Sequence, residues 1–496
     1  MDVSFEPPPL ETEEPAPSIQ QKLADARYFF LSLTIHIILV ICAAYIIITK
    51  VMETPDFVAE GGDGLLSKTE DLPPAAEQPQ ESSPSEPTES QAPTLEAPTL
   101  DVISTTNTNN AFKVVSNSTK INVSNAMDLA KTVSKASGPA GISGNGLPGT
   151  MKGRSGSGRS AAMARNKMKS ATELAVLRGL EWLRLNQNAD GSWGSASGGD
   201  SNNSAMTGLA LLCFLGHGET NTSEQYGLTV NKAVQWIIDK GTAAQGRMSM
   251  EGGFTQNGVY AHGILTYALG EYFTMSKDER CTELLKQAIN HIIQGQGPVG
   301  GWAYGFSKSE NDLSVSGWQI QALKAAHLSQ LNIPGVDEAL DKAMSYLQSV
   351  KGPQGGYGYR GPEDRYSLSG VGVLCRLFWK GDRADLRAGM QWILNKASEK
   401  DKAKPLQYKG ADSDIYAWYY HTQAALMFGG EAWDQWNKWF QDEIVGAQNP
   451  DGSWPAPGGG HGPVKEESLT GKTYRTTLCI LMLEVFYRYM PSHTAL

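Results

Sequence analysis

Hydrophobic residues follow two alternating helical patterns from about residue 166 to the C-terminus. The first is amphipathic, as in 170–187, where Val176, Leu180 and Leu183 form one apolar stripe at helical spacing. The second is apolar on almost every side and rich in small residues, which is typical of a buried helix. The two kinds alternate six times along the chain. Each amphipathic stretch therefore predicts an outer helix, and each apolar stretch predicts the inner helix that follows it.

A short polar motif lies between the two kinds of helix and recurs about every fifty residues. It reads Gln-x-x-x-Gly-x-Trp in three places, and degenerate copies end at Phe254, Tyr357 and Tyr408. The residues of the intact copies are Gln187, Gly191, Trp193, Gln296, Gly300, Trp302, Gln448, Gly452 and Trp454. A repeat of this length indicates an array of identical supersecondary units.

Six such units predict an all-α fold, an (α/α)6 toroid of six helical hairpins over residues 166–492. The predicted inner helices are 205–214, 259–273, 315–326, 368–378, 416–428 and 474–489. At the start of the first outer helix, Ser170 and Glu173 have the spacing of a capping box.

The N-terminal region carries a separate apolar run. Residues 29–49 contain no Asp, Glu, Lys or Arg, and a helix of this length spans a hydrocarbon core of about 30 Å. We therefore predict a short cytoplasmic tail over 1–26 and one transmembrane helix over 27–50. A cleaved signal peptide is the alternative, but its apolar region is shorter and a small-x-small site follows it.

Composition and charge set the intervening residues 51–165 apart from the rest. The chain of 496 residues has a formal net charge of −10, of which residues 51–112 alone carry −11. This stretch is rich in Pro and Glu, and residues 137–160 are rich in Gly and Ser. Such segments bury too little apolar surface to fold, so the prediction is a disordered linker. With no concentrated basic face on the folded part, nucleic acid is not expected as a partner.

The Gln-x-x-x-Gly-x-Trp repeats resemble those of the terpenoid cyclase and protein prenyltransferase superfamily, including squalene-hopene cyclases. The resemblance covers about 170–490 and implies the same toroid. It also implies that the motif residues stabilise the fold and do not take part in catalysis.

The catalytic motifs of that superfamily are incomplete in this sequence. The string nearest to the cyclase acid motif is DSDIYA, which keeps Asp412 and Asp414 but lacks the third acid. The alternative is that an Asp here caps a helix. In the transferase zinc motif, Ser314 follows Asp312 where a Cys ligand is expected, and His421 lies two repeats further on. No metal site and no cofactor are therefore expected.

Aromatic residues near the starts of the inner helices suggest a pocket. The candidates for its lining are Asp312, Tyr304, Trp318, Tyr359, Tyr366, Trp418 and Tyr474. An aromatic pocket with few polar groups suits an isoprenoid or another apolar ligand. Simple filling of a narrow toroid by these side chains is the alternative. We expect a binding or interaction domain with degenerate catalytic motifs. An isoprenoid- or lipid-converting enzyme using Asp412, Asp414 or His421 is the second hypothesis.

Ser32 and His36 lie four residues apart in the apolar run, on one face of the predicted helix. Together with the Pro/Glu-rich extension they resemble the anchor of TonB-type energy transducers. That resemblance implies partners in the lipid bilayer and in a proton-motive-force motor complex. It also implies a single-pass inner-membrane protein whose C-terminal domain is periplasmic.

Overall fold

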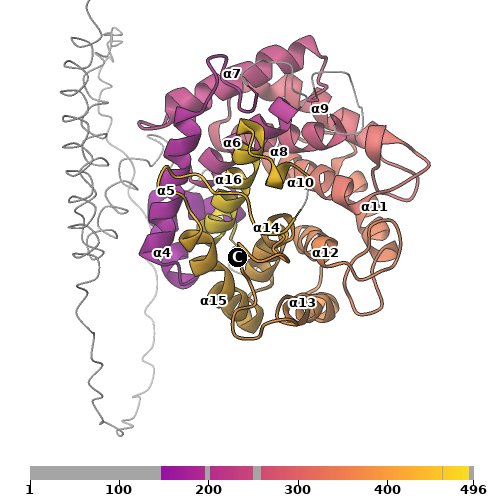
Figure 1. Cartoon of the computed structure of the whole chain (residues 1–496). Coiled ribbons are helices and arrows are strands. Elements are labelled where there is room, and N and C mark those ends of the chain that lie inside the picture. Colours follow the sequence, from indigo (N-terminus) through magenta and orange to yellow (C-terminus); the bar gives the residue numbers. More distant parts are fainter. Residues whose placement is uncertain (1–146, 196–201, 250–257, 461, 491–496) are drawn as a thin grey trace, which may run out of the picture. The chain divides into compact units, whose positions relative to one another are not determined.

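In the computed structural model, six helical hairpins form a closed ring (Figure 1). The structure describes residues 147–195, 202–249, 258–460 and 462–490. The outer helices are α5 (Ser170–Leu185), α7 (Gly227–Ala243), α9 (Thr282–Gly295), α11 (Val336–Ser349), α13 (Arg383–Ala397) and α15 (Gly430–Gly446). The inner helices are α6 (Asn202–Gly216), α8 (Gly258–Ser276), α10 (Leu313–Ser329), α12 (Tyr366–Phe378), α14 (Ile415–Phe428) and α16 (Leu469–Leu483). The (α/α)6 toroid predicted from the sequence is confirmed.

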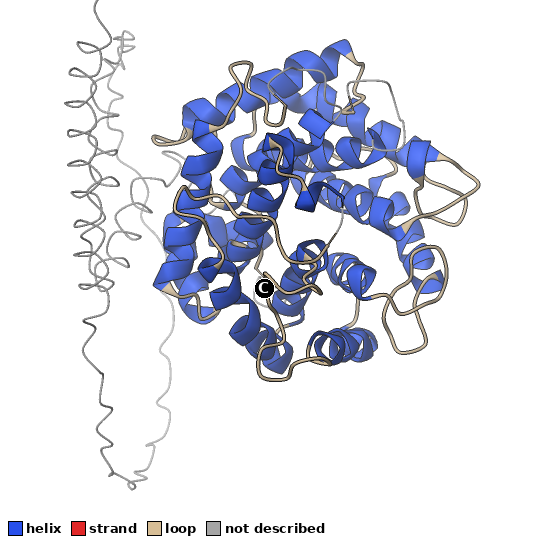
Figure 2. Cartoon of the chain, viewed as in Figure 1, coloured by secondary structure: helices blue, strands red, loops and turns tan. Residues whose placement is uncertain are grey.

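The inner helices pack side by side in chain order, and α16 contacts α6 to close the ring. Figure 2 shows that the described part of the chain is helical, and the pairing of extended backbone there is limited to isolated bridges near Tyr357. Short helices complete the fold: η2 (Gly149–Arg154), α4 (Gly156–Arg165), η3 (Glu279–Cys281), η4 (Tyr304–Phe306), η5 (Gly462–Lys465) and α17 (Val485–Arg488).

The two hydrophobic patterns account for the two rings. In the outer helix α9, the buried residues Leu285, Ala288, Ile289 and Ile292 follow one stripe. In the inner helix α8, by contrast, nearly every side chain is buried. An amphipathic helix covers a core with one face, whereas a helix that is apolar all round must be enclosed.

The repeat motif joins neighbouring hairpins. The Gln187 side chain donates from Nε2 to the carbonyl oxygens of Gly191 and Thr229, both at 3.0 Å, so it links its own turn to the next outer helix. The Trp193 indole donates to the Leu183 carbonyl at 2.8 Å. The second intact copy, at Gln296 and Trp302, makes the corresponding bonds. The motif residues thus have the stabilising role that the resemblance implied.

The last copy of the motif closes the ring. The side chain of Gln448 donates to the Ala175 carbonyl in α5 at 2.8 Å, although the two residues are 273 positions apart. The contact joins the sixth hairpin to the first in the same way that earlier copies join consecutive hairpins. The last copy of the motif therefore takes part directly in closing the ring.

Two predictions near the start of the toroid are wrong. The linker was expected to extend to residue 165, but η2 and α4 occupy 149–165 with Met151 and Ala162 fully buried. Gly and Ser content does not reveal these contacts, because their partners lie far along the chain. Nor do Ser170 and Glu173 form a capping box. The N-cap residue is Lys169, and Glu173 is buried against His217.

The predicted membrane segment 27–50, with Ser32 and His36, lies outside the described residues. The same holds for the linker up to residue 146. Among the helices that the structure describes, none is long and apolar enough to cross a bilayer.

Candidate functional site

Half-buried tyrosines surround the end of the ring at which the inner helices begin. We call this end the mouth. Its tyrosines come from inner helices and from the turns before them: Tyr260, Tyr304, Tyr359, Tyr366, Tyr416 and Tyr474. Because every inner helix begins at the same end of the ring, the repeat itself brings these residues together. Tyr304, Tyr359, Tyr366 and Tyr474 were predicted from the sequence as pocket residues.

Three of these tyrosines form a chain of hydrogen bonds between their hydroxyls. The hydroxyl of Tyr304 lies 3.1 Å from that of Tyr260 and 3.0 Å from that of Tyr359. Tyr260 also contacts the Ser314 hydroxyl at 2.5 Å. Burial raises the pKa of Tyr260 and Tyr359 above the ordinary range, so these groups stay neutral near pH 7. These hydrogen-bonded tyrosines therefore present aromatic ring faces and uncharged hydroxyls next to one another.

The sequence analysis missed Tyr260, whose hydroxyl connects the three hydrogen-bonded tyrosines to Ser314 in α10. The signal was present, since Tyr260 occupies the third position of its inner helix and Tyr416 the second position of a later one. Comparing the first turns of the inner helices would have found it.

Asp312 lies under the mouth and caps α10. It is fully buried, and its Oδ1 accepts hydrogen bonds from the backbone amides of Ser314 at 2.9 Å and Val315 at 3.3 Å. Its Oδ1 also accepts a bond from the Ser314 hydroxyl at 2.5 Å. The first amides of a helix have no partner within the helix, and a capping side chain satisfies them. Asp312 therefore holds the helix start in place.

Asp412 and Asp414, the two acids of the cyclase-like string, lie in different environments. Asp414 caps α14 by accepting from the Ala417 amide at 3.0 Å. Asp412 is exposed and pairs with the Lys400 ammonium group at 2.5 Å. A cyclase donor needs a desolvated carboxyl with a raised pKa. The hydrated, ion-paired Asp412 does not match that requirement, and Asp414 has the capping role given as the alternative.

His421 is a packing residue in α14. It is fully buried, its Nε2 lies 2.9 Å from the Tyr366 carbonyl, and its ring contacts Tyr366 and Trp436 edge to face. Burial lowers its pKa to about 3, so the ring is neutral at physiological pH. Within the described ranges, no three His, Cys, Asp or Glu side chains are grouped so that they could hold a metal ion.

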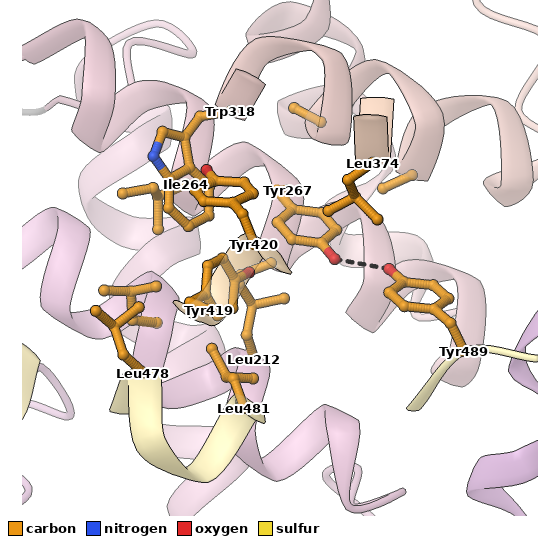
Figure 3. Close-up of a cluster of buried hydrophobic side chains, with 14 of the residues drawn as sticks. Leu212, Ile264, Tyr267, Trp318, Leu374, Tyr419, Tyr420, Leu478, Leu481 and Tyr489 are labelled. Atoms are coloured by element: carbon orange, nitrogen blue, oxygen red, sulfur yellow. Dashed lines mark hydrogen bonds between the residues drawn. The ribbon is translucent and has the colours of Figure 1, made fainter. Parts of the chain in front are cut away.

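Buried aromatic and aliphatic side chains pack together among the inner helices (Figure 3). Trp318 stacks on Tyr419 with 5.8 Å between ring centroids, and Tyr420 packs edge to face against both. Trp318 and Trp418 are each only 2% exposed. These two predicted pocket residues are therefore core residues in this structure. At the mouth, in contrast, the tyrosine side chains are only half-buried.

The comparisons with known proteins show a similarity in fold only. No protein family matches the chain, and no curated protein matches it. Solved structures similar to it include the GH76A α-1,6-mannanase of Salegentibacter sp. HEL1_6, at 13% identity and a TM-score of 0.47 over 64% of this chain and 98% of that one. Another is the type II terpene cyclase MstE of Scytonema with its substrate geranylgeranyl dihydroxybenzoate, at 13% identity and a TM-score of 0.44 over 64% and 97%. Both likenesses concern the helical toroid alone.

Proposed function

We propose that this toroid is a binding domain whose ligand or partner lies across the tyrosine-lined mouth. The observation that carries the proposal is the contrast between the packed aromatic centre and the half-buried tyrosines above it. Trp318 and Tyr419 are buried and stacked on each other, whereas Tyr304 and Tyr359 are half-buried and bonded to each other through their hydroxyls. Such a surface suits an isoprenoid or another apolar ligand that also carries a polar group.

The environments of the acidic residues favour ligand binding over catalytic conversion of a ligand. Asp312 and Asp414 both accept hydrogen bonds from helix amides, so each has a structural role as a helix cap. Asp412 is exposed and ion-paired, whereas a proton donor for an alkene needs a desolvated carboxyl. The hypothesis of an enzyme acting through Asp412 and Asp414 therefore has less support than the binding hypothesis.

We further propose that residues 27–50 anchor the domain in the inner membrane and that the toroid lies in the periplasm. The support is the uncharged run in the sequence and its resemblance to the TonB-type anchor. In this arrangement the linker holds the mouth within reach of membrane-derived ligands, and Ser32 and His36 face the motor complex.

The binding proposal is tested on the full-length chain purified in detergent, with a fluorescent analogue of farnesol as the probe. We expect Tyr304→Ala to weaken binding about tenfold, which corresponds to about 1.4 kcal/mol. Trp392→Ala is the matched control, because it removes a half-buried aromatic side chain from the outer helix α13. Equal affinities for the wild type and Tyr304→Ala would contradict the proposal.

Mass spectrometry of ligands that copurify with the chain gives an independent view. We expect an apolar molecule to be retained by the wild type and lost from Tyr304→Ala. Conversion of an added isoprenoid by the wild type, abolished in Asp414→Asn, would instead favour the enzyme hypothesis.

A further inference from the structure

The end of the toroid opposite the mouth contains a dense group of buried charges. Four glutamates from different elements gather where the inner helices end, each at most 2% exposed: Glu173, Glu219, Glu271 and Glu484. We call this group the acidic socket. Burying a carboxylate is unfavourable unless cations and hydrogen bonds compensate it. The socket therefore requires positive partners.

Two of those partners come from the segment before the first hairpin. This segment, residues 147–165, is here called the strap. Arg154 places Nη1 2.8 Å from Glu271 Oε2, and its Nε donates to the Arg488 carbonyl at 2.9 Å. Arg159 donates to His217 Nε2 at 2.9 Å and lies 3.8 Å from Glu173 Oε1. Both arginine side chains are almost completely buried.

The arginines set the ionisation of the glutamates they meet. Burial raises the pKa of Glu271, but the charges of Arg154 and Arg488 outweigh that effect and the net pKa is lowered. For Glu173, burial is likewise outweighed by His217 and Arg159. Removing the strap would leave these carboxylates with fewer cations in an apolar environment.

The cations of the toroid itself do not replace the strap. Arg488 Nη2 donates to the Tyr267 hydroxyl at 3.0 Å and lies 3.9 Å from Glu271 Oε1, which is farther than the 2.8 Å of the Arg154 contact. The Lys324 ammonium nitrogen lies 3.4 Å above the Phe378 ring and 3.7 Å above the Tyr489 ring. The socket thus matches guanidinium groups that arrive from outside the six hairpins.

The charged contacts between strap and socket are incomplete, whereas the apolar strap residues Met151 and Ala162 are fully buried. Arg154 Nη2, Arg159 Nε, Glu219 Oε2 and both carboxylate oxygens of Glu484 have no hydrogen-bond partner among the described residues. Buried polar atoms normally have hydrogen-bond partners, so the charged groups of this contact are incompletely satisfied. The hydrogen bond from Gln448 to Ala175, which joins the sixth hairpin to the first, does not involve the strap. The charged contact between strap and socket is therefore separate from that bond.

We propose that the acidic socket is a binding site for arginine-bearing segments, and that the strap occupies it in cis and can leave while the six hairpins stay folded. The occupant in trans is a strap sequence supplied by a second copy of the chain. The socket would recognise two arginines of this segment that are five positions apart, Arg154 and Arg159. The inference does not depend on what binds at the mouth.

Peptide binding tests the proposal directly. The full-length chain in detergent carries Arg154→Gln and Arg159→Gln, and the probe is a fluorescent peptide of residues 147–165. We expect this variant to bind the peptide at least ten times more tightly than the wild type, whose socket is occupied. A peptide with Gln at both positions should not bind. A peptide with Gln in place of exposed Arg165 is the matched control and should bind normally.

Failure of the double variant to bind the peptide, with its helical circular dichroism retained, would overturn the proposal. A second measurement needs no variant. Hydrogen exchange of the wild-type chain in low denaturant should show the strap amides exchanging at lower denaturant than those of α8 and α14. Simultaneous loss of protection in all three would show that the strap belongs to the core, and would also overturn the proposal.

Discussion

The two ends of the same inner helices differ in how they are held together. At the mouth, Asp312 and Asp414 cap the helices that they precede, so each acid is stabilised within a few residues of its own position. At the socket, Glu271 depends on Arg154, which is 117 positions away. Helix N-termini favour acids and helix C-termini favour cations. Acids at the mouth are thus stabilised locally, whereas acids at the socket need distant arginines.

The largest expected effect tests this contrast at the socket. We expect Glu271→Gln to lower the free energy of unfolding by about 3–5 kcal/mol, because it leaves Arg154 and Arg488 without their buried counter-charge. Asp414→Asn at the mouth should lower it by less than about 1 kcal/mol, since Asn is also a good N-cap. Urea unfolding of the full-length variants measures both values. Equal losses would show that the two ends do not differ in this way.

The pH dependence of stability should originate nearer the mouth. Burial lowers the pKa of His262 and His421 from 6.5 to about 3. Below pH 6.5 the unfolded chain binds protons that the folded chain does not, so stability falls as the pH falls from 6.5 toward 3. Between pH 6.5 and 5, each histidine contributes a loss of about 1.6 kcal/mol, or about 3 kcal/mol together.

Denaturant unfolding at several pH values checks this expectation. His421→Gln should remove about half of the pH dependence, whereas His327→Gln, which removes an exposed histidine, should leave it unchanged. The pKa values of Glu173 and Glu271 are lowered from 4.5, so their contribution is lost only in more acidic solution. A loss of stability that begins only below about pH 4.5 would assign the acid sensitivity to the socket.

A smaller effect is expected at the turns beside the mouth. Gly300 has a φ of +103°, and a Cβ there would lie 2.1 Å from the Lys342 carbonyl oxygen. Gly300→Ala should lower the unfolding free energy by about 2 kcal/mol through backbone strain and this close contact. Gly446→Ala, in open space at the end of α15, should raise it by about 0.4–1 kcal/mol. Thermal unfolding of the pair should show opposite shifts, and shifts of the same sign would contradict the prediction.

The sequence predicted the fold well because the information is local and repeated. A helix–turn–helix unit with Gln187, Gly191 and Trp193 at fixed spacing specifies its own geometry, and six such units form a ring. Part of the mouth was equally predictable, since Tyr304 and Tyr359 each lie two residues after the aromatic residue of the motif in consecutive repeats. The failures concern residues whose partners are remote. Glu173 has capping-box spacing, yet it pairs with Arg159 and His217.

The sequence by itself determined the helical toroid, its number of hairpins and the aromatic character of its mouth, because helical periodicity and turn geometry depend on neighbouring residues. Only the tertiary structure decided that Trp318 and Trp418 belong to the core and that Asp412 is exposed. It alone joined the strap to the socket. Burial and charge pairing between residues hundreds of positions apart depend on how the ring closes, which no short stretch of sequence contains.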